Sequence, residues 1–220
     1  MWRFIFSLIL IGYTTSLVAQ DRPQLPKEKV SFKPHDIKVG LNAIRTGRTM
    51  FGTDIQTYEV QGILALHQFN LVADLGSEKN TRGESFGYES SGNYFRIGTD
   101  WNFVKDRPSG NILSLGLRYA RAYFKDELVF SGDQGFGEQT FAYANPKLRA
   151  RWFEVTFNLR GKVVSNLYMG FTMRWQAFRT LRGEETLKAY EIPGFGKTKR
   201  QNSTGFDYYI MWRIPFEKVE

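Results

Sequence analysis

The sequence has no cysteine and only two histidines among its 220 residues. The lack of cysteine excludes a disulfide scaffold, thiol catalysis, cysteine-ligated zinc and lipid attachment through cysteine. His35 precedes the first predicted strand and His67 lies in a predicted short turn. Neither histidine is placed beside a nucleophile or within a set of metal ligands. We therefore predict that the protein is not an enzyme and has no metal or cofactor.

Long hydrophobic runs are also scarce, and the mean hydropathy of −0.38 argues against a helical membrane protein. The run from Phe4 to Tyr13 follows a single basic residue, Arg3, and is shorter than the ~20 residues of a spanning helix. Small and polar residues follow it up to Ala19. This order predicts a signal peptide over residues 1–19, and hence export. The proline-containing segment 20–34 is predicted to be an extended linker.

Aromatic residues are abundant, with 19 Phe, 11 Tyr and 5 Trp, and they occur beside a net charge of +8. Apolar and polar side chains alternate with a period of two, which predicts strands with two different faces. No helix is predicted after residue 20. The predicted strands cover residues 37–43, 58–66, 69–76, 95–103, 113–120, 153–159, 167–176 and 206–216.

The connections between these strands alternate in length. Short links are expected near 67–68, 104–110 and 160–166, and long ones over 47–56, 77–92, 125–147 and 180–203. Long loops at one end and tight turns at the other are typical of outer-membrane proteins. We therefore predict an all-β fold, an eight-stranded antiparallel up-and-down transmembrane β-barrel over residues 35–216, followed by a tail at 217–220.

Alternation alone also fits a soluble lipocalin-like barrel with its apolar face inside. Three features favour an apolar face directed outward. Large aromatics, among them Tyr94, Phe124 and Trp152, gather toward strand ends, as in interfacial girdles. Glycines lie on the polar face, where they leave room for long side chains in a narrow interior. Both signs of charge share that face, and they are expected to form ion pairs in the lumen: Glu59, Asp74, Arg96, Asp100, Arg118, Glu154, Arg174, Asp207 and Arg213.

Basic residues flank the first and fourth predicted long loops. At the outer rim they would face the phosphates of lipopolysaccharide, although ordinary solvation is an equal alternative. Nucleic acid is not an expected partner, because the protein is exported and has no basic recognition element. This predicted loop basic patch comprises Arg45, Arg48, Arg179, Arg182, Lys197, Lys199 and Arg200.

The overall pattern resembles a family of uncharacterised outer-membrane β-barrel proteins of Bacteroidota, over about residues 35–216. The resemblance implies an outer-membrane location, outer-membrane lipid as the surroundings and the barrel-assembly machinery as a partner in biogenesis. It implies no activity, so no functional residues carry over. We expect a structural protein or one that binds through its long loops; a narrow solute channel and a lipocalin-like periplasmic carrier are the alternatives. The stretches that carry the resemblance are residues 91–103, 115–120, 150–154, 167–171, 190–197 and 206–216.

Overall fold

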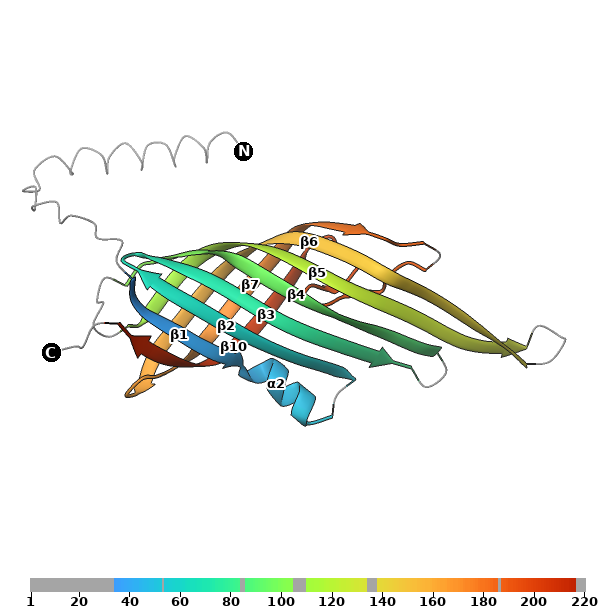
Figure 1. Ribbon diagram of the computed structural model, residues 1–220, viewed down its shortest axis with the longest axis horizontal. Helices are drawn as coiled ribbons and strands as arrows, with labels where there is room; N and C mark the ends of the chain where they lie inside the picture. The colour runs from blue at the N-terminus through green and yellow to red at the C-terminus, as the bar shows by residue number, and fades with distance from the viewer. Residues whose placement is uncertain are drawn as a thin grey trace, which may run out of the picture. The chain divides into compact units, whose positions relative to one another are not determined.

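The computed structural model describes residues 34–52, 54–83, 86–104, 110–133, 138–185 and 187–216. The predicted signal peptide, the predicted tail and all of the predicted linker except Pro34 lie outside these residues. One helix and ten strands are described (Figure 1). They are β1 (Pro34–Asn42), α2 (Ala43–Met50), β2 (Ile55–Leu66), β3 (Phe69–Arg82), β4 (Phe86–Asn102), β5 (Ile112–Asp133), β6 (Glu138–Val164), β7 (Leu167–Arg182), β8 (Glu191–Ile192), β9 (Gly196–Lys197) and β10 (Ser203–Pro215).

The eight long strands form one antiparallel sheet that closes on itself. Each strand pairs with the next long strand of the sequence, and β1 also pairs with β10, for example Val39 opposite Trp212. Closure gives the strands hydrogen-bonding partners on both sides, which leaves no exposed sheet edge. The prediction of an all-β fold with eight antiparallel strands is thus confirmed. The two short strands, β8 and β9, make a separate hairpin.

The two faces of this sheet differ sharply. On β3, Leu71 and Leu75 are 44% and 66% exposed, whereas Val72 and Asp74 between them are buried. The other strands repeat this alternation over their central parts, with large apolar side chains on the outer face and charged ones inside. Hydrogen bonds between non-neighbouring strands, such as Arg96 on β4 to Glu59 on β2, cross the interior.

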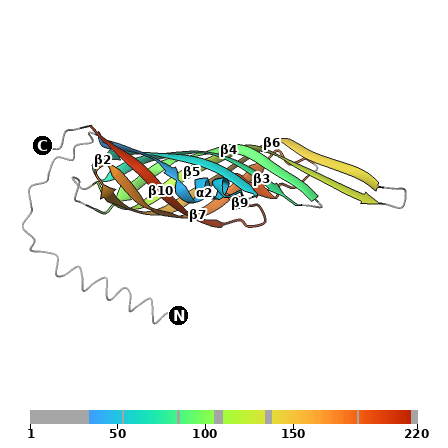
Figure 2. The same ribbon diagram turned by 90° about the horizontal axis from the view of Figure 1, so that it is seen from below.

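Two of the predicted long loops are in fact strands. Residues 77–82 and 86–92 are the paired ends of β3 and β4, with Thr81 opposite Glu89. Residues 125–133 and 138–147 are the paired ends of β5 and β6, with Gly132 opposite Gln139. This hairpin extends beyond the other strands (Figures 1 and 2). The composition of this hairpin is polar, as in a loop. The backbone pairing nevertheless continues, because hydrogen bonds between strands do not require an apolar face.

The first long connection contains the helix α2, where no helix was predicted. Asn42 caps it, because its side chain accepts a hydrogen bond from the backbone N–H of Arg45 at 3.2 Å. Gly47 and the two threonines of the helix have low helix propensity, so its sequence gives little local signal. The helix is instead held by its contacts with β2 and β10. No helix among the described residues is long and apolar enough to cross a membrane.

We call the end with the helix and the long hairpins the loop end, and the opposite one, at residues 67–68 and 165–166, the turn end. Two apolar clusters separate the interior into layers. Near the turn end lie Ile63, Val72, Ile112, Tyr168, Tyr209 and Met211. Near the loop end lie Tyr94, Ala120, Ala122, Phe124, Leu148, Ala150, Trp152, Ala189, Ile192 and Phe195.

Candidate functional site

A network of buried charges occupies the interior between the two apolar clusters. All nine residues that the sequence nominated for ion pairs are buried. Salt bridges connect eight of them into a single network, and Arg213 instead pairs with Asp36 at 2.8 Å. The eight connected residues are Glu59, Asp74, Arg96, Asp100, Arg118, Glu154, Arg174 and Asp207.

Arg174 on β7 is the centre of this network. Its guanidinium lies 2.6 Å from the carboxylate of Asp207 and 3.1 Å from that of Glu154. It also lies 3.2 Å from the carboxylate of Asp74 and 3.6 Å from that of Glu59. One cation therefore contacts carboxylates from four strands, β2, β3, β6 and β10, and links walls of the sheet that are far apart along the chain.

Two further arginines complete the neutralisation of these carboxylates. Arg96 lies 2.7 Å from Glu59 and 2.9 Å from Glu154. Arg118 lies 3.0 Å from Asp74, and 3.1 Å from Asp100. Because a buried ion is stable only when it is paired and hydrogen-bonded, these bridging contacts are what permit so many charges inside.

Polar residues that the sequence analysis did not nominate satisfy the remaining carboxylate oxygens. The hydroxyls of Tyr94 and Tyr209 both donate to Glu59. Trp152 donates from its indole Nε1 to Glu154 at 2.7 Å, and Asn42 donates to Asp207 at 2.7 Å. The alternation along the strands could have identified two of these donors, since Tyr94 shares a face with Arg96 and Trp152 shares one with Glu154.

The prediction that three aromatic residues belong to an interfacial girdle is wrong. Tyr94, Phe124 and Trp152 are 3%, 5% and 0% exposed and lie inside the sheet. Their strand-end position suggested an interfacial role, but their place in the alternation puts them on the inner face. There they contribute to the interior apolar cluster at the loop end and, for Tyr94 and Trp152, to the charge network.

The inward glycines make room for these long side chains, as the sequence suggested. A Cβ atom at Gly76 would lie 2.2 Å from the ring of Tyr94, and one at Gly116 would lie 1.9 Å from the carboxylate of Asp100. Both are closer than any real contact. The small residue on one strand thus creates the space for the large residue on its neighbour.

A smaller polar group lies at the turn end. Asp36 accepts hydrogen bonds from Lys38 at 2.7 Å and from Arg213 at 2.8 Å. His35 and His67 border a hollow of about 30 Å³ beside it. The described residues contain no group of three or more His, Cys, Asp or Glu side chains that could hold a metal ion.

The fourth long connection folds into the loop end of the interior rather than outward. Its hairpin, β8–β9, buries Ile192 and Phe195, and the Phe195 ring packs edge-on against Trp152 at 5.5 Å. The carbonyl of Gly194 at its tip accepts hydrogen bonds from Arg96 and Gln176, each at 2.9 Å. The hairpin therefore acts as a plug that is fastened to the charge network.

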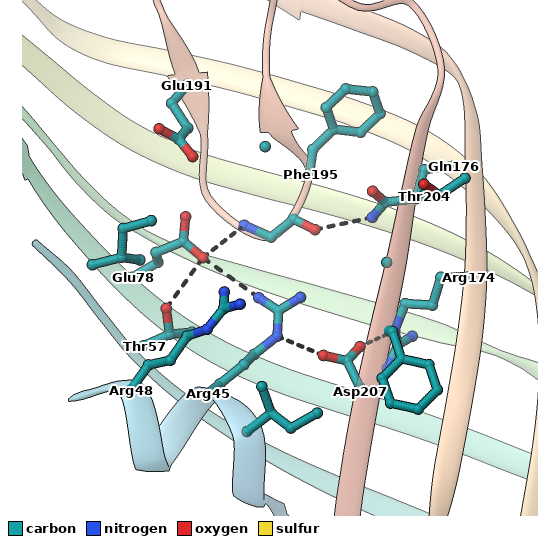
Figure 3. A pocket seen from close by; sticks show the side chains of 16 residues that line it. Arg45, Arg48, Thr57, Glu78, Arg174, Gln176, Glu191, Phe195, Thr204 and Asp207 are labelled. Carbon is teal, nitrogen blue, oxygen red and sulfur yellow. Dashed lines mark hydrogen bonds and ion pairs between the residues drawn. The ribbon is translucent and has the colours of Figure 1, made fainter. Parts of the chain in front are cut away.

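A pocket of about 350 Å³ remains between this plug, α2 and β10. Figure 3 shows Arg45 reaching from the helix toward Glu78 and Asp207, at 3.5 and 2.8 Å. The interpretation of Arg45 as part of a basic patch on the outer rim is therefore wrong, because its guanidinium faces the interior carboxylates. Arg48, one helical turn further, is exposed and borders the same pocket.

The other members of the predicted loop basic patch lie around β9 and at the end of β7. Arg179 donates to the carbonyl of Thr198 at 3.1 Å, and the Nζ atom of Lys197 lies 5.8 Å from the centre of the Tyr190 ring. Arg182 lies at the end of β7, whereas Lys199 and Arg200 are exposed near β9. Arg179 thus lies beside the segment that contains Lys197, Lys199 and Arg200, whereas Arg45 faces the interior.

A separate polar cluster lies on the strand extensions of the loop end. Asp126 accepts hydrogen bonds from Asn145 at 2.8 Å and from the Tyr88 hydroxyl at 3.4 Å. Burial raises the pKa of the Asp126 carboxyl above its usual range. Burial, with the nearby Asp126 charge, raises the pKa of Tyr88 to about 12. The cluster fastens the β4–β5–β6 extensions to one another.

The interior is a continuous network of ion pairs and hydrogen bonds. Its carboxylates are each held by cations or donors, and neither histidine reaches them: both lie at the turn end. Perturbed charged groups arise in structural ion-pair networks as well as in active sites. The arrangement fills the interior of the sheet with paired charges.

A comparison with the curated proteins found no match. A family model does match, over residues 1–219, and its description is Domain of unknown function (DUF6048). This agrees with the expectation of an uncharacterised family. The chain belongs to this family.

Proposed function

We propose that the protein is an outer-membrane β-barrel without enzymatic activity, which serves as a structural or binding protein through its loop end. The observation that carries this proposal is the direction of the two faces. The charge network lies inside the closed sheet and the large apolar side chains lie outside it. An apolar outer surface suits the hydrocarbon of a bilayer. The closed sheet also suits it, because all backbone groups must be hydrogen-bonded there.

The extent of the outer apolar surface favours a bilayer, and not water, as the environment of this face. Leu117 is 60% exposed, Ile97 57% and Met173 52%, and they stand on three different strands. Soluble monomers seldom expose contiguous apolar patches larger than a few hundred Å². A lipocalin-like carrier needs its apolar face inside, around a ligand, and here charges occupy the middle of the interior.

Several aromatic residues of the outer face lie toward its two ends. Phe69 and Trp101 are exposed near the turn end, and Tyr58, Trp175 and Phe206 are exposed nearer the loop end. Aromatic girdles at both lipid–water interfaces are typical of outer-membrane barrels. The distribution supports a membrane layer between them.

The filled interior favours a closed barrel over a solute channel. Arg174 and its carboxylates occupy the middle, and the β8–β9 plug covers the loop end. We expect no steady conductance when the purified chain is reconstituted in planar bilayers. Steady pores would support the channel instead.

The proposed location is tested by fractionation of cells that express the full chain. We expect the protein in the outer-membrane fraction, where detergent releases it and high salt does not. Recovery from the periplasm in soluble form, without detergent, would support the lipocalin-like carrier. Depletion of the barrel-assembly machinery should lower the amount in the membrane if that machinery inserts it.

The absence of cysteine allows a direct test of orientation. Ser131→Cys places a thiol on the β5–β6 extension at the loop end, and Lys162→Cys places one near the turn end. With a membrane-impermeant maleimide on intact cells, we expect labelling of the first variant alone. Both should react once the cells are broken. Labelling of Lys162→Cys alone on intact cells would reverse the proposed orientation.

A further inference from the structure

We propose that the outer wall of β5, β6 and β7 binds the phosphate group of a membrane lipid. This inference rests on the proposed membrane location, and it names a partner and a site for it. The site, which we call the wall patch, differs from the loop basic patch of the sequence analysis and shares only one residue with it. The wall patch consists of Arg121, Lys125, Lys147, Arg149, Arg151 and Arg182.

The wall patch begins where the outer apolar surface ends. On β5 the outward positions run from Leu117 and Tyr119 to Arg121, and on β6 they run from Phe153 to Arg151. The sheet thus changes from apolar to cationic over a single outward step, on the loop-end side of the apolar surface. This is the level at which a lipid headgroup would meet a barrel wall.

The patch contains like charges in direct cross-strand register. Arg121 pairs with Arg151 between β5 and β6, and Arg149 pairs with Arg182 between β6 and β7. Like charges directly opposite each other destabilise a sheet. None of these four arginines makes a salt bridge within 4.0 Å to any described carboxylate. An anion from outside the chain would relieve this repulsion.

A hollow in the wall provides space for such an anion. The register of β5 and β6 shifts between Phe124 and Asp126, where two residues of β6, Pro146 and Lys147, stand opposite the single residue Lys125 of β5. This bulge borders a hollow of about 360 Å³, lined also by Lys125 and Arg149. Three of the six residues of the wall patch, Lys125, Lys147 and Arg149, thus line a concave feature of the sheet.

Tyr123 holds two of the arginines at the edge of this hollow. The guanidinium carbon of Arg121 lies 4.8 Å from the centre of the Tyr123 ring, and that of Arg149 lies 6.0 Å from it. Such cation–π contacts restrict the side chains without neutralising their charge. Both guanidiniums are thus presented outward and remain able to bind an anion.

The charge is confined to this part of the wall. Along the same row of the sheet, Tyr123 is opposite Asn93, and Asn93 is opposite Ser77, both uncharged. One outward step further, Lys79 is neutralised by Glu89 at 3.1 Å. Ordinary solvation of a rim would not concentrate six cations on three adjacent strands.

The chemistry of the patch favours a phosphorylated lipid over a soluble phosphate. Guanidinium groups bind phosphate with two parallel hydrogen bonds, which suits an arginine-rich site. Acyl chains attached to that phosphate would lie along the apolar surface directly beside the patch, at Tyr119 and Phe153. A soluble phosphate gains the charge contacts alone and should therefore bind more weakly.

The test uses the full chain in nonionic detergent and three probes: dioctanoyl phosphatidic acid, inorganic phosphate and dioctanoylglycerol. The patch variant carries Arg121→Gln, Arg149→Gln and Arg151→Gln. The matched control removes the same charge from exposed residues elsewhere, with Lys162→Gln, Lys199→Gln and Arg200→Gln. The readouts are the dissociation constant, from tryptophan fluorescence, and the unfolding midpoint.

We expect phosphatidic acid to raise the unfolding midpoint of the unmodified chain, and the patch variant to bind it at least about tenfold more weakly. The control should bind like the unmodified chain. Without lipid, the patch variant should be at least as stable as the unmodified chain, since cross-strand repulsion is removed. Unaltered binding by the patch variant, an equal loss in the control, or equally tight binding of inorganic phosphate would overturn the proposal.

A flotation experiment separates this proposal from the membrane assignment. The unmodified chain and the patch variant are both refolded with vesicles of phosphatidylcholine, which carry no net charge. If both float with the vesicles and only the unmodified chain retains phosphatidic acid, both proposals stand. If both float and both retain it equally, the wall patch is overturned and the membrane assignment stands. If neither floats, the membrane assignment fails.

Discussion

At the scale of single residues, Arg174 should be the interior side chain whose loss matters most. It contacts four carboxylates at 2.6 to 3.6 Å and is fully buried with them. Arg174→Met leaves these carboxylates without their shared cation, so we expect a loss of about 3–5 kcal/mol in the free energy of unfolding. Urea titration in detergent, followed by tryptophan fluorescence, measures it.

Two further variants make this prediction specific. Arg200→Met removes an exposed arginine and should change stability by less than about 0.5 kcal/mol. Adding Asp207→Asn to Arg174→Met should recover part of the loss, because it removes one negative charge from a network that has lost a cation. A double variant that is less stable than Arg174→Met alone would show that the network is not held in the proposed way.

A second prediction compares two glycines of the sheet, one on the inner face and one on the outer face. A Cβ at Gly98, on the inner face, would lie 2.1 Å from the backbone oxygen of Leu117, whereas the nearest atom to one at Gly62, on the outer face, is 3.9 Å away. We expect Gly98→Ala to destabilise the protein by about 1–3 kcal/mol. Gly62→Ala should be neutral or stabilising by up to about 1 kcal/mol. Thermal unfolding of both variants in the same detergent provides the comparison.

The sequence alone could identify which charges share a face, but not which of them meet. Period-two alternation places Glu59, Arg96 and Glu154 on one face of their strands. Their contacts depend on closure of the sheet and on register, which bring β2, β4 and β6 around a common interior. Arg45 could not be placed in this way, because it lies on a helix that the alternation does not contain.

At the scale of elements, the β8–β9 plug should open independently of the sheet. Its main apolar anchor is Phe195, which packs on Trp152. Phe195→Ala removes that contact and should increase amide hydrogen exchange across residues 188–198, while exchange in β2 and β3 stays unchanged. Lys199→Ala is the control, since Lys199 lies on the same connection and its side chain is exposed. Equal acceleration in β2 and β3 would show that plug and sheet unfold together.

The strand extensions of the loop end should respond to pH through Asp126. Its pKa is raised by burial, so the folded protein binds this proton more readily than the unfolded chain does. The buried charge therefore destabilises the extensions at neutral pH. Stability should rise as pH falls through the folded-state pKa, and the gain is complete below the ordinary carboxyl pKa.

Hydrogen exchange of the β5–β6 extension at neutral and mildly acidic pH measures this effect. Asp126→Asn keeps the size of the side chain and removes the charge, so we expect it to be protected at neutral pH and to lose the pH response. Glu127→Gln is the neighbouring control, because Glu127 points to the exposed side of β5. An unchanged pH response in Asp126→Asn would exclude Asp126 as its source.

Prediction of the elements succeeded where an apolar face was present and failed where it was not. All eight long strands contain the alternating segments that the sequence shows. The sequence predicts loops at the ends of β3 to β6, because the polar residues there show no alternation, although pairing such as Thr81 opposite Glu89 continues there. The helix Ala43–Met50 was missed because its stability depends on tertiary contacts.

At the scale of the whole molecule, the decisive quantity is the environment of the outer face. In a water-soluble protein, an exposed leucine or valine can be replaced by arginine at little cost wherever it stands. In a bilayer, the same replacement depends on depth, with about 2–4 kcal/mol lost at the midplane and about 0–1 kcal/mol near the interface. Depth dependence thus distinguishes a membrane barrel from a soluble carrier.

Leu117 and Val163 form a matched pair for this measurement, because they are 60% and 59% exposed. Leu117 lies within the outer apolar stretch of β5, whereas Val163 lies at the end of β6 beside the tight turn at 165–166. We expect Leu117→Arg to lower the free energy of unfolding from phosphatidylcholine vesicles by about 2–4 kcal/mol and Val163→Arg by about 1 kcal/mol or less. If both variants lose the same small amount, the apolar face does not meet hydrocarbon, and the fold is a carrier whose outer surface has another partner.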